Sequence, residues 1–253
     1  MPLQVRYWLL FFLLPLLSFH DNSEVPAKKK IKILYVGNSL TYSNDLPAIV
    51  KEMGQKDGVT INYESILFAN YALEDHWNDG KVKEEIEKGN YDFVVMQQGP
   101  SAAPESQGLL ELYAKMFAQT CYKVKTVPVL YMVWPSKARS FDMDNVIKSY
   151  SNAAERTNSV LAPAGLAWKN AWQKDGTLPL YSEDDFHPSV TGTVLAALTV
   201  YGAVTLKKEF DFLTKAKTSW RKEISAANWN ILAKAALQAL NIDEQEKTDK
   251  ASF

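Results

Sequence analysis

Residues 31–42, IKILYVGNSLTY, join an apolar run to a turn of small and polar residues. Apolar residues follow one another from Ile31 to Val36, interrupted only by Lys32, without the strict alternation of a half-exposed strand. This pattern is typical of a strand that helices cover on both faces. Gly37 and Asn38 favour a turn directly after it. Ser39 is therefore predicted at the carboxyl end of a central parallel strand, the edge where open α/β sheets bind ligands.

The rest of the chain alternates strand-like and helix-like stretches, which indicates repeated βαβ units and a parallel sheet. Further strands are predicted at residues 59–67, 91–97 and 128–134, with a short fifth strand over LAPAGLAW at residues 161–168. Helices are predicted at residues 45–55, 105–120, 144–159 and 189–206, followed by an amphipathic tail at 219–240. The fold class is therefore α/β, a three-layer α/β/α sandwich with a flavodoxin-like, doubly wound parallel sheet of about five strands. One compact domain is expected over residues 26–253.

Composition limits the possible partners and cofactors. The chain has 253 residues, of which 47% are hydrophobic and 23% charged, enough for one full core. Its net charge of −1 gives no reason to expect a nucleic-acid partner. The single cysteine, Cys121, is interpreted as a buried helix residue, and with only three histidines present it excludes a Cys-rich zinc site. No metal or other cofactor is expected.

The amino-terminal residues are typical of an export signal. Arg6 precedes an apolar run from Tyr7 to Phe19, which is shorter than the ~20 residues of a membrane-spanning helix. Residues 1–25 are therefore predicted to be a signal peptide and linker, and the protein to be secreted or periplasmic. No A-x-A-like cleavage site follows the run, so an uncleaved segment is the alternative and the only membrane contact expected.

A serine becomes a nucleophile when a base takes its proton and a third group orients that base. Outside the leader, the available histidines are His76 and His187. His187 follows Asp184 by three residues in the polar segment YSEDDFHPS, so the carboxylate can accept the Nδ1 proton and leave Nε2 for the serine. In the alternative interpretation, Asp184 or Asp185 caps the following segment and His187 is a surface residue.

Together, G-N-S-L-T at residues 37–41 and D-x-x-H at residues 184–187 resemble the motifs of the SGNH or GDSL hydrolase superfamily, over residues 30–206. The resemblance implies that Ser39 is the nucleophile, His187 the base and Asp184 the acid that orients it. Asn38 stands where the GDSL motif has aspartate, as in the variant that reads G-N-S, and is expected beside the substrate.

The resemblance also implies an oxyanion hole, although the middle motifs of this chain depart from the family pattern. The asparagine of the third motif is absent, and the chain reads VVMQQGPS. The carbohydrate-esterase-like branch is similar in having a Q-G pair, which implies that the Gln98 amide is a donor. Gln97 is the alternative, because a one-residue shift in a strand reverses the side-chain direction. The other implied donors are the Ser39 N–H and a backbone N–H of Ala69 or Asn70.

Several aromatic residues and His76 fall near the predicted site. Trp134 is expected at the rim of the cleft, whereas Trp168 and Trp172 are expected in the core. His76 lines the cleft in one interpretation and is packed or at the surface in the other. Ser219 and Lys222 fit S-x-x-K, but the companion β-lactamase motifs are missing, and Ser219 is interpreted as a helix cap.

The resemblance implies a secreted serine esterase that removes small acyl groups, chiefly acetyl, from a carbohydrate or another small molecule. Two alternatives stay open. One is a lipase or thioesterase of the same superfamily. The other is a carbohydrate-binding protein without activity, which is the expectation if the altered motifs have broken the oxyanion hole.

Overall fold

The structure, a computed structural model, describes residues 29–251, with side chains described as far as residue 240. The predicted signal peptide and linker at residues 1–25 lie outside this range. Within it, no helix is both long enough and apolar enough to cross a bilayer.

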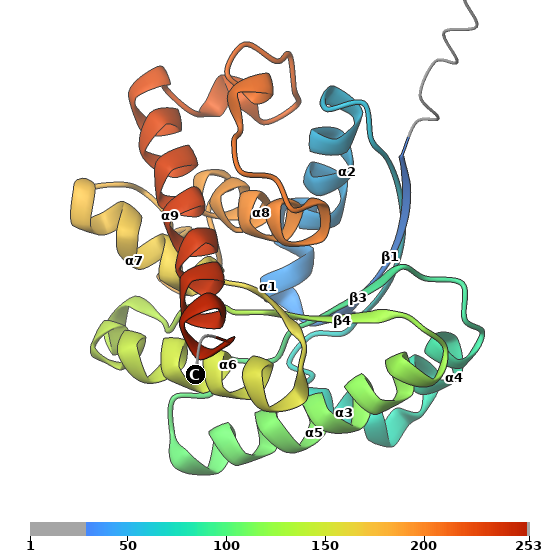
Figure 1. The fold of residues 1–253 in the computed structure, drawn as a ribbon. Helices are drawn as coiled ribbons and strands as arrows, with labels where there is room; N and C mark the ends of the chain where they lie inside the picture. Colours follow the sequence, from blue (N-terminus) through green and yellow to red (C-terminus); the bar gives the residue numbers. More distant parts are fainter. Residues whose placement is uncertain (1–28, 252–253) are drawn as a thin grey trace, which may run out of the picture.

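A five-stranded parallel sheet with the order β2-β1-β3-β4-β5 forms the centre of the molecule (Figure 1). The strands are β1 (Lys30–Gly37), β2 (Thr60–Leu67), β3 (Phe93–Met96), β4 (Val127–Tyr131) and β5 (Val160–Ala162). Strand β1 pairs with β2 on one side and β3 on the other, and Ile33, Leu34, Tyr35 and Val36 are completely buried. The predicted strand with Ser39 at its carboxyl end is confirmed as part of the sheet interior.

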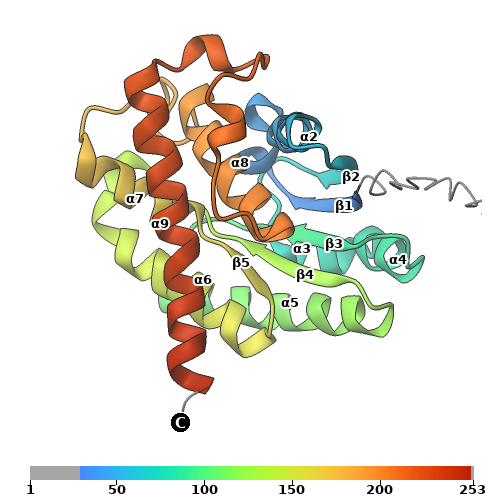
Figure 2. The same cartoon turned by 45° about the horizontal axis from the view of Figure 1, so that its top comes forward.

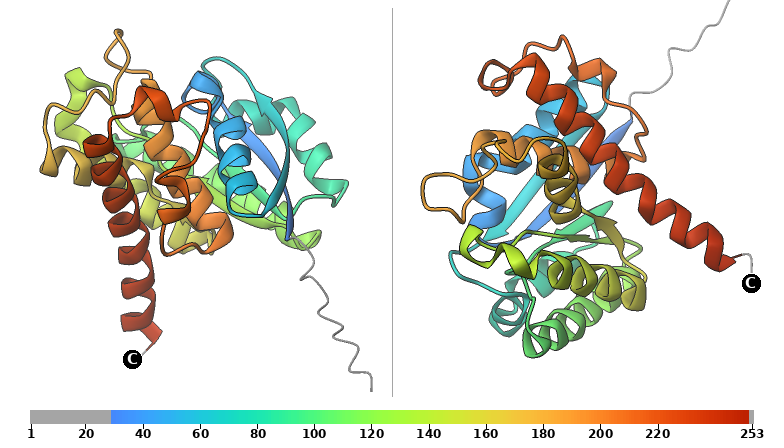
Figure 3. Two further views of the ribbon diagram at one scale, coloured as in Figure 1. Left: turned by 90° about the horizontal axis from the view of Figure 1, so that it is seen from above. Right: turned by 90° about the vertical axis from the view of Figure 1, so that its left-hand side faces the viewer.

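Helices cover both faces of the sheet, as Figure 2 shows, so the predicted three-layer α/β/α class is confirmed. One layer contains α2 (Leu46–Lys56), α7 (Ala164–Lys174), α8 (Val190–Thr205) and α9 (Ala226–Ala251). The other contains α3 (Leu73–Asp79), α4 (Lys81–Glu87), α5 (Pro104–Lys123) and α6 (Met143–Thr157). Helix α9 runs along the outside of its layer (Figure 3). Cys121 is buried on α5 as predicted, and burial raises the pKa of its thiol to about 12.

Two local expectations are wrong, and two helices were not predicted. Strand β5 is only three residues long, because Pro163 ends it and α7 begins at Ala164. Ser219 does not cap a helix, since its N–H and hydroxyl both donate to the Glu52 carboxylate and α9 begins seven residues later, at Ala226. Helices α3 and α4 form where no helix was predicted.

Candidate active site

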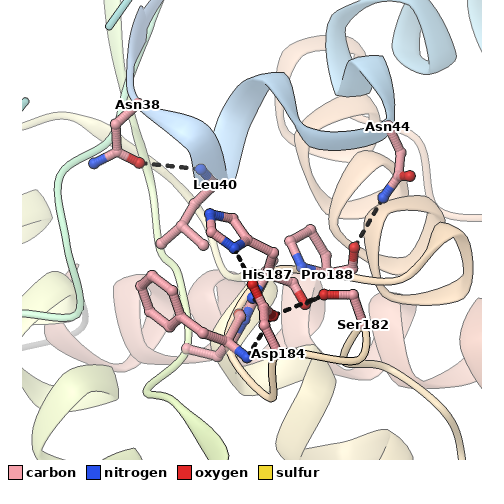
Figure 4. Close-up of polar contacts among 9 residues, drawn as sticks. Asn38, Leu40, Asn44, Ser182, Asp184, His187 and Pro188 are labelled. Carbon is pink, nitrogen blue, oxygen red and sulfur yellow. Dashed lines mark hydrogen bonds and ion pairs between the residues drawn. The ribbon is translucent and has the colours of Figure 1, made fainter. Parts of the chain in front are cut away.

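The chain leaves β1 through Gly37 and Asn38 and places Ser39 at the first position of the short helix α1 (Ser39–Tyr42). The Asn38 side-chain oxygen accepts the N–H of Leu40 at 3.0 Å (Figure 4), and its backbone carbonyl accepts the N–H of Thr41 at 2.9 Å. These bonds satisfy two amides of the helix start. Ser39 itself is half-buried and forms no side-chain hydrogen bond within the described part of the chain.

Gln97 stabilises the turn at residues 37–41 through its side-chain oxygen. Its Oε1 accepts the Asn38 N–H at 3.1 Å and the Thr41 hydroxyl at 3.0 Å, and the side chain is completely buried. A Cβ at Gly37 would lie 2.5 Å from that oxygen, so only glycine lets the glutamine approach so closely. Gln97 thus faces the nucleophile turn with its acceptor atom.

The second half of the site is the loop between α7 and α8. His187 Nδ1 lies 2.5 Å from Asp184 Oδ2 (Figure 4). The other carboxylate oxygen accepts from the Ser182 hydroxyl and from the N–H groups of Phe186 and His187 at 2.8–3.0 Å. The bond from His187, followed by those from Ser182 and the two amides, lowers the pKa of Asp184 well below its usual value. Because an ionised carboxylate only accepts, the proton lies on Nδ1 and Nε2 is available as a base.

Asp185 points to a different partner. Its carboxylate forms an exposed ion pair with Lys137 at 3.0 Å, and its backbone carbonyl accepts the Lys137 N–H. Asp184 is therefore the carboxylate that bonds the imidazole. It also binds two backbone amides of its own loop, so the capping interpretation describes part of its role.

Asn44 joins the two halves of the site, although no motif in the sequence selects it. It lies in the short helix η1 (Ser43–Asp45), directly after α1, and its side-chain N–H group donates to the carbonyl of Pro188 at 2.9 Å. The loop is closed by a bridge between Tyr181 and Pro188. Ser39 Oγ and His187 form no hydrogen bond in the structure, but this contact brings their segments together.

Gln98, the predicted side-chain donor to the oxyanion, forms its hydrogen bonds with residues outside the turn of Ser39. Its Nε2 donates to Ser101 Oγ at 2.8 Å and more weakly to the Ser106 carbonyl at 3.4 Å, and its Oε1 accepts the N–H of Leu73. No hydrogen bond joins Gln98 to Ser39 in the described chain. Its role at an oxyanion therefore stays a prediction.

The predicted backbone donors lie in an exposed turn after β2. Ala69 and Asn70 are its central residues, and the Tyr71 N–H donates back to the Phe68 carbonyl. The Asn38 amide donates to the Tyr71 carbonyl at 2.9 Å and so ties this turn to the nucleophile turn. The structure does not distinguish the two as donors.

His76 is buried beneath the nucleophile turn and does not line a cleft. Its Nε2 lies 2.9 Å from the Gly37 carbonyl, which can only accept, so Nε2 carries the proton. Its Nδ1 has no partner among the described residues. Burial lowers the pKa of this imidazole. The alternative of a packed histidine therefore agrees with the structure.

Trp134 is also completely buried, so the expectation that it lies at the rim is wrong. Its ring stacks on Trp168 with centroids 3.6 Å apart, and its Nε1 donates to the Phe186 carbonyl at 3.2 Å. The reason is that α7 brings Trp168 over the end of β4. Trp134 supports the His187 loop from inside the core.

No group of three or more histidine, cysteine or carboxylate side chains suited to a metal ion occurs among the described residues. No protein-family model and no curated relative matches the sequence. Several solved structures are similar in fold over most of this chain.

A DUF4886 family protein from Bacteroides uniformis aligns with a TM-score of 0.66 at 17% identity, covering 84% of this chain and 95% of its own. A lipase/acylhydrolase from Enterococcus faecalis aligns with a TM-score of 0.56 at 17% identity, covering 68% and 93%. A catalytic mutant of an acetylxylan esterase from Geobacillus stearothermophilus aligns with a TM-score of 0.53 at 17% identity, covering 70% and 95%. The same fold is found in a putative SGNH hydrolase from Slackia heliotrinireducens, which aligns with a TM-score of 0.59 at 23% identity, covering 69% of this chain and 99% of its own. The chain therefore has the fold of the SGNH/GDSL hydrolases, as predicted.

Proposed function

We propose that the protein is a serine esterase that removes small acyl groups, chiefly acetyl, from carbohydrate esters, and that it is exported by its amino-terminal segment. The observation that carries the proposal is the 2.5 Å contact between Asp184 and His187, on a loop that Asn44 ties to the turn of Ser39. The similarity in fold to a lipase/acylhydrolase and an acetylxylan esterase supports ester hydrolysis as the class of reaction.

In the proposed mechanism, Ser39 Oγ attacks the ester carbonyl while His187 Nε2 takes its proton. The alkoxide leaving group departs with that proton from the imidazolium, and the acyl group stays on Ser39. Water then attacks the acyl-enzyme, giving its proton to His187, and the carboxylic acid is released as Ser39 regains a proton. Asp184 holds the imidazole and stabilises its charged form in both steps.

The negative charge that develops on the carbonyl oxygen needs donors. We propose the Ser39 N–H, the N–H of Ala69 or Asn70 and the side chain of Gln98. Gln98 contributes only if one amide hydrogen leaves its long contact with the Ser106 carbonyl. This is the weakest part of the proposed oxyanion hole, and it favours the second candidate function, carbohydrate binding without catalysis.

The decisive experiment is hydrolysis of 4-nitrophenyl acetate by the wild type and by Ser39→Ala. We expect turnover by the wild type and a loss of about 10⁴-fold or more in the variant. Thermal stability should change little, because the half-buried serine side chain forms no hydrogen bond in the described part of the chain. Equal turnover by both proteins rejects Ser39 as nucleophile. No turnover by the wild type, combined with binding of an acetylated oligosaccharide, favours the binding protein. Faster turnover of long-chain acyl or thioester substrates favours a lipase or thioesterase.

A further inference from the structure

A cavity of about 260 Å³ opens beside the His187 loop. It lies between residues 100–106, which lead from β3 into α5, and residues 135–142, which lead from β4 into α6. Phe186 forms one wall, and its ring centroid lies 5.2 Å from that of His187. Ser101 also lines the cavity and is the residue that binds the Gln98 amide. The volume is just below the ~300–1,000 Å³ typical of ligand pockets, so it suits one ring-sized group.

Arg139 is the one cationic residue that lines this cavity. Its Nε and Nη2 both bind the same oxygen of Asp142, at 2.8 and 2.6 Å. The Asp142 side chain is 11% exposed, whereas the arginine side chain is 61% exposed. The nearly buried carboxylate therefore orients a guanidinium group that stays open to solvent.

The geometry of the pair leaves one edge of the guanidinium unused. Asp142 occupies the edge formed by Nε and Nη2, and Nη1 has no partner among the described residues. The remaining edge, formed by Nη1 and the second Nη2 hydrogen, presents two parallel N–H groups. Such a fork matches the two oxygens of a carboxylate and binds it more strongly than a neutral acceptor.

The other lining groups are compatible with an anion. Ala103 and Ser106 lie at the start of α5, a 20-residue helix whose first turn has no side-chain cap, so its amides and helix dipole favour negative charge. Glu105 belongs to the same turn, but it is exposed and does not line the cavity. Asp142 is the only carboxylate in the lining, and it is the one that binds the other edge of the Arg139 guanidinium.

We propose that this cavity binds the alcohol part of the ester and selects alcohols that carry a carboxylate, such as an acidic sugar ring, through Arg139. The inference rests on the proposed esterase function. His187 returns its proton to the leaving alcohol, so the alcohol oxygen must lie beside that imidazole, and the cavity is the adjoining space. Arg139 is then a specificity residue that the chemical step does not require.

The test compares two acetylated methyl glycosides of a hexuronic acid as substrates, one with a free carboxylate and one with that carboxyl group converted to its uncharged methyl ester. In the wild type, kcat/KM is expected to be about 10- to 100-fold higher for the carboxylate form, the range expected for a hydrogen-bonded charge pair. Arg139→Gln should bring the ratio of the two values close to one, and Arg139→Lys should give an intermediate ratio because it keeps the charge but loses the fork. The matched control is Arg156→Gln, since Arg156 pairs with Glu111 and is 63% exposed, away from the cavity. It should keep the wild-type ratio.

Binding of free hexuronate, measured by titration calorimetry on wild type and Arg139→Gln, separates this inference from the esterase proposal. If the wild type hydrolyses both substrates at the same rate, the proposal that the cavity selects carboxylates is wrong, and the proposed esterase function is unaffected. Arg139-dependent hexuronate binding without any hydrolysis overturns the esterase and supports an anion site. If Arg139→Gln lowers kcat/KM equally for both substrates and also lowers Tm, the arginine has a structural role and the inference is wrong.

Discussion

Asn44 donates its side-chain N–H to the backbone carbonyl of Pro188, which lies 144 positions further along the chain, at 2.9 Å. The same amide nitrogen is 2.9 Å from the Thr193 hydroxyl, in the first turn of α8. The bond to Pro188, which Figure 4 shows, holds the segment after Ser39 against the residue after His187. The relative position of the proposed nucleophile and base therefore depends on a residue that takes no part in the proposed chemistry.

Asn44→Gly should lower kcat about 10- to 100-fold, because a displacement of about 1 Å between reacting groups can have an effect of that size. Glycine is the right substitution, since Asn44 has a φ of 53°, and alanine would add backbone strain to the loss of the side chain. Steady-state kinetics on 4-nitrophenyl acetate measure the effect.

The control for this variant is Asn158→Gly. Asn158 has a φ of 52° at the end of α6, away from both halves of the site, so the substitution makes the same backbone change elsewhere. Its kcat should equal that of the wild type. Similar losses in the two variants would assign the effect to backbone flexibility and not to the bond with Pro188.

Asp184→Asn should lower kcat about 10²- to 10⁴-fold, because an amide no longer selects the tautomer with the proton on Nδ1. Asp185→Asn is the matched comparison and removes only the exposed ion pair with Lys137. Such pairs contribute little to stability, typically about 0–1 kcal/mol, so this variant should resemble the wild type in both kcat and Tm. The assignment of the acid is wrong if Asp185→Asn is the slower enzyme.

Local patterns predicted much of the fold and part of the site, while long-range contacts decided the rest. The apolar runs were sufficient to predict a parallel sheet, and the turn motif together with the D-x-x-H spacing selected Ser39, Asp184 and His187. Asn44 has its partner in a distant segment, so its own surroundings in the sequence carry no signal. Trp134 follows a buried strand, but its exposure depends on Trp168, which a later helix contributes.

The two adjacent glutamines, Gln97 and Gln98, are a second case in which the sequence does not predict which residue makes the contact. Gln97 and Gln98 directly follow β3, where a shift of one residue changes the side chain that faces a given direction, so the sequence does not say which one meets the nucleophile turn. In the structure Gln97 accepts from Asn38 and Thr41, and Gln98 turns toward Ser101. The family resemblance favoured Gln98 as the oxyanion donor, and only kinetics can test that role.

Gln97→Ala should lower the free energy of unfolding by about 1–3 kcal/mol, because the Asn38 N–H and the Thr41 hydroxyl lose a buried acceptor. Its kcat should also fall, since the same bonds shape the turn that carries Ser39. Thermal melting and steady-state kinetics on the purified variant measure both effects. A variant with wild-type melting would show that water replaces the glutamine at no cost.

Gln98→Ala separates a catalytic from a structural role. If the amide stabilises the oxyanion, kcat should fall about 10²- to 10³-fold with KM scarcely changed, because the bond forms only in the transition state. If Gln98 merely binds Ser101 and the N–H of Leu73, Tm should fall and kcat should stay close to that of the wild type. The second result would leave the oxyanion to backbone donors alone.

His76 predicts a specific dependence of stability on pH. Burial favours its neutral form and holds its pKa below the usual value of about 6.5, so as pH falls the unfolded state takes up the proton first. The stabilisation from neutral His76 is therefore complete above about pH 6.5 and is lost as the pH falls below that value. His76→Gln keeps a donor for the Gly37 carbonyl but cannot titrate, so its Tm should change less between pH 7 and pH 5 than that of the wild type.

The comparison needs Tm at closely spaced pH values for both proteins in one buffer series. Each unit of pKa depression corresponds to about 1.4 kcal/mol, and each kcal/mol to a Tm change of about 2–4 °C in a chain of this size. His187 and the carboxylates near His76, Asp75 and Asp79, are present in both proteins, so their contributions largely cancel in the difference. Parallel curves would mean that His76 takes up its proton equally in the folded and unfolded states, against the burial that the structure shows.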